Sequence, residues 1–416
     1  MQIFNLFFVY SYINLSFKKF YFILEMTEDL SKIQKDVKQY FISTRKYLII
    51  PEKYIGVQVK KIGGLSNINY SIIIKDMSTN QKFAHVLYRK FGALSESVNH
   101  DLETIIINYL AEKGYGPKLL YEVPGDYRIS EFLIGTTTIP KEKTFDQNLL
   151  DKLYVILNLF TSISYTYQYK VNGDNILLNR IDDGIKEQRI EVKKNQYENC
   201  MVDWLERSKK IFKKFRDEFE QKYTKEKNPK EWADVEMVQY YLDNFKEHFG
   251  KNFPNQGFLV LNHNDTHRLN VLVRKVDQKL FLIDQEFSFL NLPGNDITNY
   301  LNESLYNYEP DYYCLLDKLD FNKTYYYYEK FINLFIQEHL FIEKYEGGKE
   351  FMNLIRTKKY FIQVTNIINL YWFLWSFCYT DFKTWDKDHY GEYYFVHGID
   401  RLKFYLAGMK AIEALN

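Results

Sequence analysis

Three polar side chains lie at the ends of short apolar segments in the second half of the chain. Asp265 and Asn270 are five positions apart in GFLVLNHNDTHRLNVLVRK, which joins two strand-like runs. Asp284 follows Asn270 by 14 positions and ends the apolar run LFLI. Phosphoryl transfer needs a carboxylate that orients or deprotonates a hydroxyl, and oxygen ligands that hold Mg²⁺ against a triphosphate. The spacing therefore predicts a phosphotransfer centre with Asp265 as the base and Asn270 and Asp284 as metal ligands.

The residues around this centre favour it over simpler explanations. An isolated Asp-x4-Asn pair occurs by chance in many proteins, and both side chains could serve only the backbone of a β-turn. His263 and Asn264 before the pair, an apolar run on each side and Asp284 downstream argue against coincidence. A zinc or serine-histidine-aspartate site fits less well, because no third ligand or nucleophile motif accompanies the histidines at 263 and 267.

A phosphate donor also needs a nucleotide site, and the residues before position 135 offer candidates for it. The turn GGLSN at 63–67 could present backbone N–H groups to phosphate, although an ordinary hairpin turn fits equally well. Arg89 could contact a phosphate and pair with Glu103 on the next helix, the alternative being an exposed arginine at a strand end. The backbone of EFL at 131–133 could face adenine. The predicted nucleotide-binding residues are Gly64, Ser66, Asn67, Arg89, Glu103, Glu131 and Leu133.

Apolar periodicity predicts the elements that must position these residues. Apolar side chains alternate along INYSIIIK at 68–75, and FAHVLYRK at 83–90 is a second strand. The segment 100–114 is typical of a helix that ends at Gly114. Apolar residues at three- and four-residue spacing over 149–163 predict a long amphipathic helix, and aromatic-rich helices follow to the C-terminus. We expect an α+β chain with a small β-rich lobe followed by a larger, mainly helical lobe.

The length of the chain supports this division. A chain of 416 residues exceeds what one hydrophobic core usually supports. We expect an N-terminal ATP-binding lobe over 26–134 and a C-terminal catalytic and substrate-binding lobe over 135–416. The highly charged stretch 175–235 predicts a solvated helical region within the second lobe.

Charge and cysteine content exclude other classes of protein. The formal net charge of +1 argues against a chain that holds a nucleic-acid backbone. Three widely separated cysteines make neither a disulfide framework nor a CxxC metal pair, which favours a reducing compartment. We therefore expect a cytoplasmic protein that binds no nucleic acid.

Residues 1–25 form an apolar, aromatic extension of uncertain status. Polar residues interrupt it, no basic residue precedes the apolar stretch, and no clear small-residue cleavage site follows. It is too short and too polar for a confident membrane span, so no stable membrane insertion is expected. Met26 begins a more ordinary cytosolic sequence, which points to an over-extended start or a docking segment, with a signal peptide as the less favoured alternative.

Taken in order, the motifs over about residues 60–405 resemble the choline/ethanolamine kinase family, a branch of the protein-kinase-like fold. LSNINYSI resembles its phosphate loop and VLYRKFG its strand with an ATP-contacting arginine. HNDTHRLNVLV resembles the catalytic loop, LIDQEFSFLNLPGNDITNYLNES the metal-binding and choline-site motif, and YWFLWSF the late tryptophan pair. The resemblance implies a two-lobed protein-kinase-like fold, the cofactors ATP and Mg²⁺, and a homodimer.

The segment after Asp284 favours a small-molecule substrate. It lacks the DFG and APE motifs that bound the activation loop of protein kinases. A quaternary ammonium donates no hydrogen bonds, so ring faces and nearby carboxylates must hold it. The resemblance implies a substrate site made of Glu286, Glu303, Tyr308, Trp372, Trp375 and Tyr394. Plain core packing is the alternative for the two tryptophans.

The resemblance implies ATP-dependent phosphorylation of choline to phosphocholine, the first step toward phosphatidylcholine. Ethanolamine is the alternative alcohol, and an aminoglycoside-type phosphotransferase or a non-catalytic pseudokinase binding module are more distant alternatives. Gln285, Thr266, His267 and Glu131 depart from the residues usual in the family. These departures leave the base and metal ligands in place but bear on how ATP and the alcohol are oriented.

Overall fold

The computed structural model describes residues 30–44, 52–63, 67–92, 100–172, 175–180, 189–193, 196–253, 259–307, 313–344, 347–378 and 390–415. The chain separates into two compact units. The first takes in the described residues up to His100 together with Ile107–Ile134, and the second takes in Asp101–Ile106 and the chain from Gly135 onward. An antiparallel sheet dominates the first and helices dominate the second, as the α+β prediction requires. The extension at 1–25 lies outside the described residues, and the functions assigned to 26–134 and 135–416 stay predictions.

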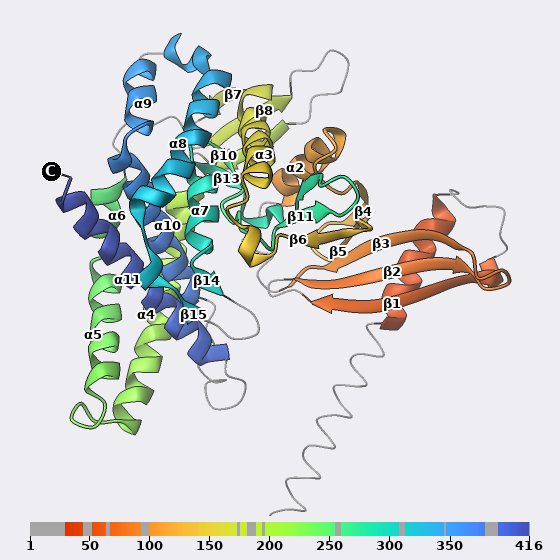
Figure 1. Ribbon diagram of the computed structural model, residues 1–416. Coiled ribbons are helices and arrows are strands. Elements are labelled where there is room, and N and C mark those ends of the chain that lie inside the picture. Colours follow the sequence, from red (N-terminus) through yellow and green to blue (C-terminus); the bar gives the residue numbers. More distant parts are fainter. Residues whose placement is uncertain are drawn as a thin grey trace, which may run out of the picture. The chain divides into compact units, whose positions relative to one another are not determined.

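A five-stranded antiparallel sheet forms the first unit, with strand order β1-β2-β3-β5-β4 (Figure 1). Its strands are β1 (Ile55–Gly63), β2 (Ile68–Asp76), β3 (Lys82–Lys90), β4 (Leu119–Val123) and β5 (Tyr127–Glu131). The alternation predicted for 68–75 is present, because Tyr70, Ile72 and Ile74 are buried on one face of β2. Tyr88 of β3 stands opposite Tyr70 on the same face.

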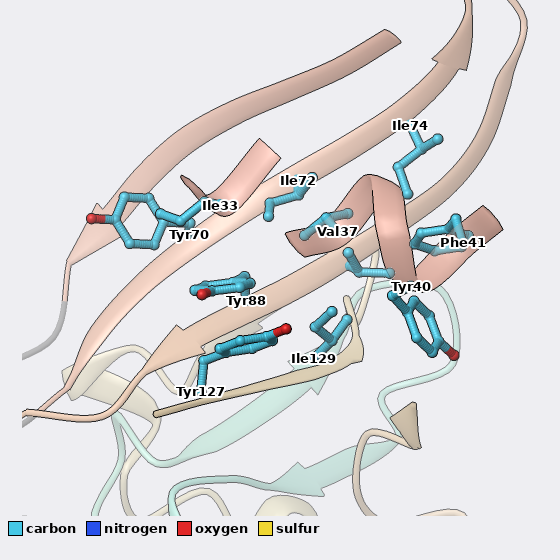
Figure 2. Packing of buried hydrophobic residues seen from close by; sticks show 11 residues of the cluster. Ile33, Val37, Tyr40, Phe41, Tyr70, Ile72, Ile74, Tyr88, Tyr127 and Ile129 are labelled. Atoms are coloured by element: carbon cyan, nitrogen blue, oxygen red, sulfur yellow. The ribbon is translucent and has the colours of Figure 1, made fainter. Parts of the chain in front are cut away.

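A helix at 30–43 packs on that face of the sheet (Figure 2). Ile33, Val37, Tyr40 and Phe41 follow helical spacing, so one side of the helix meets the sheet residues. Each fully buried side chain of this kind contributes about 1.5–3 kcal/mol through removal of apolar surface from water. Arg89 directly follows Tyr88 in β3, so it lies on the opposite face of the sheet from this helix.

The helix predicted at 100–114 is α2 (His100–Glu112). Leu102, Ile106 and Leu110 are buried along one side of it. Gly114 has a φ of 78° directly after the helix, a left-handed conformation that glycine adopts without strain and that commonly ends helices.

The second unit contains nine further long helices and several short strands among its described residues. The helices are α3 (Gln147–Thr166), α4 (Gln196–Lys222), α5 (Pro229–Asp243), α6 (Phe245–Asn252), α7 (Asn295–Glu303), α8 (Phe321–Glu338), α9 (Gly348–Ile355), α10 (Lys358–Cys378) and α11 (Tyr390–Glu413). The strands are β6 (Thr136–Thr138), β7 (Tyr167–Asn172), β8 (Asn175–Arg180), β9 (Arg189–Lys193), β10 (Val260–Asn262), β11 (Val271–Arg274), β12 (Leu280–Leu282), β13 (Phe289–Asn291), β14 (Tyr306–Asn307) and β15 (Tyr313–Cys314).

Two of the predicted segments differ in how well the sequence anticipates them. The amphipathic helix predicted at 149–163 is α3, and its apolar side is buried. In the charged stretch 175–235, α4 and α5 are the expected helices. However, β7, β8 and β9 form a three-stranded antiparallel sheet that the charge-rich composition did not predict.

The centre of the second unit is α10, most of whose side chains are buried. It packs against α4, α7 and α11. One of its tryptophans, Trp372, contacts Phe287 in the segment that follows β12. In the part of the chain that the structure describes, no helix combines the length and the apolar character needed to cross a bilayer.

Candidate active site

Short strands bring the three predicted catalytic residues together in the second unit. The polar loop at 263–270 joins β10 to β11, and Asp284 follows β12. Because β11 and β12 pair antiparallel, the end of one lies beside the start of the other. The backbone N–H of Ile283 donates to the carbonyl of Asn270 at 3.0 Å. Asn270 and Asp284 are therefore neighbours across this hairpin.

Asn270 also holds Asp265, the predicted base. Its side-chain Nδ2 donates to the backbone carbonyl of Asp265 at 2.9 Å and to the carboxylate Oδ2 of Asp265 at 3.0 Å. A β-turn without function would make the first of these bonds too. Because both amide hydrogens are used, Oδ1 is the Asn270 atom left as an oxygen ligand. Asn270 is buried, whereas Asp265 is partly exposed, as a base that meets substrate must be.

Asp284 has an unusual backbone conformation. Its φ of 67° lies in the left-handed region, which few residues other than glycine occupy. Such conformations concentrate at functional sites, where the surrounding structure stabilises them. Here the conformation ends β12 and begins a short 3-10 turn at Gln285–Phe287.

The two oxygen donors fit Mg²⁺, which takes a few carboxylate or carbonyl oxygens and completes its shell with water and phosphate. Within the described residues, no three of His, Cys, Asp and Glu gather into a set of metal ligands. A structural or catalytic zinc site built from such a set is therefore not found in this part of the chain. Asn270 and Asp284 suit a metal that the nucleotide helps to hold.

His263 makes hydrogen bonds to the backbone of Asp265 and to the residue before Asp284. Its Nε2 lies 2.8 Å from the carbonyl of Ile283, the residue before Asp284. The backbone N–H of Asp265 donates to its Nδ1 at 3.3 Å. These partners assign the ring proton to Nε2. His263 is fully buried, so it braces the loop and is not a ligand to substrate.

A buried carboxylate anchors the start of the loop. The two oxygens of Asp296 accept the backbone N–H groups of His263 and Asn264, both at 2.8 Å. Burial raises the pKa of the Asp296 carboxyl above its ordinary value, and these donors oppose the rise. Asp296 lies in the first turn of α7, where the helix dipole favours a negative charge.

Three asparagines complete the support of the loop. Asn264 has a φ of 63°, a left-handed conformation that asparagine tolerates. Its Oδ1 accepts from Asn291 at 2.9 Å and from Asn295 at 3.0 Å, and its Nδ2 donates to the Phe287 carbonyl at 2.9 Å. The sequence indicated His263 and Asn264 as flanking residues, but it gave no sign of these partners.

His267, one of the departures noted in the sequence, lies beside the predicted base. Its Nε2 is 3.6 Å from Oδ2 of Asp265, and its Nδ1 accepts the backbone N–H of Leu269 at 3.2 Å. Burial disfavours the charged imidazolium, yet nearby carboxylates, that of Asp265 above all, outweigh it and raise the pKa of His267. The carboxylate of Asp265, the predicted base, therefore favours the charged form of this imidazole.

Two predicted nucleotide residues are held by hydrogen bonds in the first unit. The guanidinium Nε of Arg89 donates to Oδ1 of Asn69 at 3.1 Å, and Arg89 is buried, unlike an exposed arginine at a strand end. Oδ1 of Asn67 accepts the backbone N–H of Gly92 at 3.2 Å. Gly64 and Ser66 of the predicted phosphate turn lie outside the described residues.

The predicted adenine connector follows β5. The backbone N–H of Glu131 donates to the carbonyl of Lys118 at 2.8 Å, and that of Phe132 donates to the carbonyl of His85 at 3.2 Å. The rings of His85 and Phe132 stack with centroids 3.9 Å apart, which stiffens the connector before Leu133. Glu103 is buried on α2. Its pairing with Arg89 stays a prediction.

Three of the four aromatic residues predicted for the substrate site lie together in the second unit. Trp372 and Trp375 meet edge to face with centroids 5.5 Å apart, and Trp375 meets Tyr394 in the same way at 5.4 Å. Phe287, which the sequence analysis did not include, meets Trp372 at 5.8 Å. We call these four residues the aromatic group. Tyr308 lies outside the described residues.

Exposure differs along the aromatic group. Trp372 is buried, as the core-packing alternative expects, whereas Trp375 and Tyr394 are partly exposed. Glu286, on the 3-10 turn after Asp284, is partly exposed as well. The partly exposed residues Trp375, Tyr394 and Glu286 are the parts of the predicted substrate site that solvent reaches.

Glu303 has an internal cation as its partner. Its Oε1 accepts from Nη2 of Arg401 at 2.5 Å, and both side chains are buried. The guanidinium of Arg401 lies 3.9 Å from the ring centroid of Tyr306, a close cation–π contact. The family resemblance implied that Glu303 is a counter-charge for the substrate, and Arg401 was not among the predicted residues. An arginine among the apolar residues of an aromatic helix was the available signal.

Arg401 is itself fixed by a buried histidine. Its Nε donates to Nε2 of His397 at 3.2 Å, and Nδ1 of His397 lies 2.7 Å from Oγ of Ser376. Burial, together with the neighbouring guanidinium, holds the pKa of His397 well below its usual range. A neutral His397 that accepts from Arg401 agrees with this direction. The result is one neutralised ion pair beneath the aromatic group.

Known proteins resemble this chain in sequence and in fold. The sequence model of the choline/ethanolamine kinase family matches residues 59–406. A choline kinase structure from Cryptosporidium parvum Iowa II is 18% identical with a TM-score of 0.59, and the match covers 93% of this chain and 98% of that one. An ethanolamine kinase structure from Plasmodium vivax is 19% identical with a TM-score of 0.50, over 88% and 87%. None of the curated protein sequences matches. These likenesses confirm the predicted two-lobed kinase-like fold.

Proposed function

Since the chain belongs to the choline/ethanolamine kinase family, whose members are small-molecule kinases, we propose that it transfers the γ-phosphoryl group of ATP to choline. The products are phosphocholine and ADP. The family match and the similar structures support a choline or ethanolamine kinase without deciding between the two alcohols. The choice of choline, the residues that act and the metal belong to the proposal.

Asp265 is the proposed base. It orients the choline hydroxyl and takes its proton as the oxygen forms a bond to the γ-phosphorus and the bond to the β–γ bridging oxygen breaks. Nδ2 of Asn270 donates to the carboxylate of Asp265 at 3.0 Å, and Nδ1 of His263 accepts the backbone N–H of Asp265. Both contacts reduce the motion of the base, which supports orientation of the hydroxyl.

Asn270 and Asp284 are the proposed ligands of Mg²⁺, which neutralises charge on the phosphates when it is bound. Arg89 is the proposed partner of the ATP phosphates. The remaining proposed nucleotide contacts are Gly64, Ser66, Asn67, Glu103, Glu131 and Leu133.

The edge-to-face series of Trp372, Trp375 and Tyr394 is the observation that carries the choice of choline. A trimethylammonium group is bound through ring faces, because it cannot donate hydrogen bonds. Glu286 supplies a nearby negative charge, while Glu303 is already neutralised by Arg401. A primary ammonium would need several hydrogen-bond acceptors, and the neutralised Glu303 favours it less. Ethanolamine is the second candidate, supported by the accessible carboxylate of Glu286.

Three wider proposals accompany this activity. Phosphocholine formation would begin the route to phosphatidylcholine. We also propose that the chain forms a homodimer and acts in the cytoplasm, without nucleic-acid partners. Size-exclusion chromatography with light scattering tests the dimer, and a single-chain mass at micromolar concentration would overturn it.

Product analysis tests the proposed activity. The purified full chain is incubated with ATP, Mg²⁺ and choline, and the phosphorus-containing products are resolved by ³¹P NMR. We expect phosphocholine and ADP in equal amounts, and none when a chelator removes the metal. Formation of phosphoethanolamine alone, in a parallel reaction with ethanolamine, would reverse the choice of alcohol. No phosphorylated alcohol of either kind would contradict the activity.

A further inference from the structure

One buried side chain joins the catalytic loop to the aromatic group. Asn299, in the middle of α7, is completely buried. Its Nδ2 donates to the backbone carbonyl of Thr266 at 3.1 Å. Its Oδ1 accepts the indole N–H of Trp372 at 3.0 Å. Both ends of a single amide are therefore committed, one to each region.

Each partner of Asn299 lies next to a part of the proposed site. Thr266 directly follows Asp265, the proposed base, and Thr266 is fully buried. Trp372 is the buried member of the aromatic group and contacts Trp375 and Phe287. A rigid planar amide between them fixes how far the base lies from the rings.

The proposed substrate makes that distance important. In choline, two carbons separate the nitrogen from the hydroxyl oxygen. If the ammonium rests on the ring faces, the hydroxyl meets the base only when the two regions have the matching separation. Small displacements of reacting groups lower turnover strongly, because the attacking atom leaves its reactive position.

We propose that Asn299 is a positioning residue that sets the separation between the aromatic group and Asp265, and so selects an alcohol with two carbons between nitrogen and oxygen. The inference rests on the proposed function, since it assumes that a cationic alcohol is the substrate. Asn299 is buried and acts through Thr266 and Trp372, without touching the alcohol. The number of carbons in the accepted alcohol is thus determined by a residue that does not touch the alcohol.

A matched control exists on the same helix. Asn302 is three residues further along α7 and is also buried. Its side-chain Nδ2 has no hydrogen-bond partner in the structure. Asn302→Ala therefore removes the same kind of side chain from the same helix without breaking the connection between the loop and the rings. Any general effect of a smaller residue in α7 appears in this variant.

The test compares choline with its homologue that has one additional methylene, 3-(trimethylammonio)propan-1-ol. We measure kcat and KM of both alcohols at saturating ATP for the wild type, Asn299→Ala and Asn302→Ala. We expect the wild type and Asn302→Ala to favour choline strongly. In Asn299→Ala, kcat for choline should fall about 100-fold with little change in KM, because the base and the hydroxyl no longer align. The preference for choline over the longer alcohol should fall at least tenfold.

The ratio of kcat/KM for choline to kcat/KM for the longer alcohol is the decisive measurement. Both are measured on one preparation, so a partly folded sample changes the two rates equally and leaves the ratio unchanged. Trp372→Phe tests the same connection from its other end, since phenylalanine keeps an aromatic face and lacks the indole N–H. It should lower the same ratio, and the double variant should lower it no further than the larger single effect.

The outcomes separate the inference from the function on which it rests. A wild type that phosphorylates choline, with an unchanged ratio in Asn299→Ala and Trp372→Phe, overturns the role of Asn299 alone. An equal fall in Asn302→Ala also overturns it. If the wild type accepts only primary amines, ethanolamine and 3-aminopropan-1-ol make the same test of spacing. If it phosphorylates none of these alcohols, the proposed function and the inference fail together.

Discussion

The loop at 263–270, which carries the proposed base, and the aromatic group lie in the same unit but are held by different forces. Backbone N–H groups of the loop donate to the buried carboxylate of Asp296, and His263 ties the loop to the strand before Asp284. The aromatic group instead depends on ring contacts between segments that are distant in sequence. Hydrogen bonds to a buried charge are directional, whereas ring contacts tolerate repacking.

This difference predicts that the two regions affect different kinetic constants. Substitutions in the loop should lower turnover and leave the affinity for the alcohol nearly unchanged. Substitutions of the partly exposed Trp375 and Tyr394 should change affinity and selectivity and leave turnover nearly unchanged, whereas Trp372 also acts on turnover through Asn299. Each prediction below tests one side of this division.

Asp265→Asn should have the largest effect. It removes the proposed base without changing the size of the side chain, so kcat should fall about 1,000-fold, the range expected for a general base. ATP binding, measured by calorimetry, should change little. Asp277→Asn is the matched control, because Asp277 lies in the β11–β12 turn and pairs with Arg274 at the surface. A kcat within threefold of the wild type in Asp265→Asn would remove the loop from the mechanism.

Asp296→Asn should have the next largest effect. The amide offers one acceptor oxygen where two backbone N–H groups now donate, and its own N–H₂ faces a donor. We expect about 2 kcal/mol less stability toward urea. Misplacement of the base should lower kcat by about 100-fold. An unchanged kcat with lowered stability would show that the loop keeps its geometry without this anchor, and the comparison drawn above would fail.

Trp375→Leu tests the other side of the comparison. Loss of a cation–π partner should raise KM for choline about tenfold, because such a contact contributes about 1–2 kcal/mol in a partly desolvated site. The kcat should stay within about threefold of the wild-type value. Trp232→Leu, on α5, controls for the loss of a tryptophan packed elsewhere, here against Phe219. A large fall in kcat with unchanged KM would contradict the division.

Two histidines should give the smallest effects, with opposite dependence on pH. The pKa of His397, beneath the aromatic group, is held below its usual value by burial and by Arg401. Its contribution to stability is therefore present above about pH 6.5 and is lost as pH falls, by at most about 1.4 kcal/mol per pH unit. The pKa of His267, in the loop, is raised. Its contribution is present below about pH 6.5 and is lost as pH rises through the folded-state value.

Denaturant unfolding between pH 5 and pH 8 measures both contributions. His397→Gln should flatten the loss of stability on the acid side, and His267→Gln should flatten the loss at higher pH. If neither variant changes the slope of unfolding free energy against pH, the environments assigned to the two histidines are wrong.

The sequence predicted the loop better than its supports. Asp265, Asn270 and Asp284 could be found because they lie within 20 residues and between short apolar runs whose pairing is local. The partners of the loop could not be found in this way. Asp296 is 33 residues from His263, and nothing in the periodicity of α7 says which buried polar residue meets which backbone group.

The contacts around the aromatic group were even harder to predict from the sequence. Resemblance to a family suggested Trp372, Trp375 and Tyr394, whereas Phe287 and Tyr306 were not suggested. Arg401 is 98 residues from Glu303, and a buried ion pair leaves no local pattern. The strands β7–β9 were missed because the segment 175–235 was interpreted as one charged helical region, although RIEVK of β9 alternates charged and apolar residues. Tertiary pairing decides these features.

A comparison of alcohols tests the central claim most directly. The rate of ADP release by the purified chain is measured at saturating ATP and Mg²⁺ with choline, ethanolamine and an aminoglycoside as acceptors. The structure and the family lead us to expect the highest kcat/KM with choline, a lower value with ethanolamine, and no release above background with the aminoglycoside. The highest value with the aminoglycoside, or a release of ADP that no acceptor changes, would contradict a kinase of small cationic alcohols.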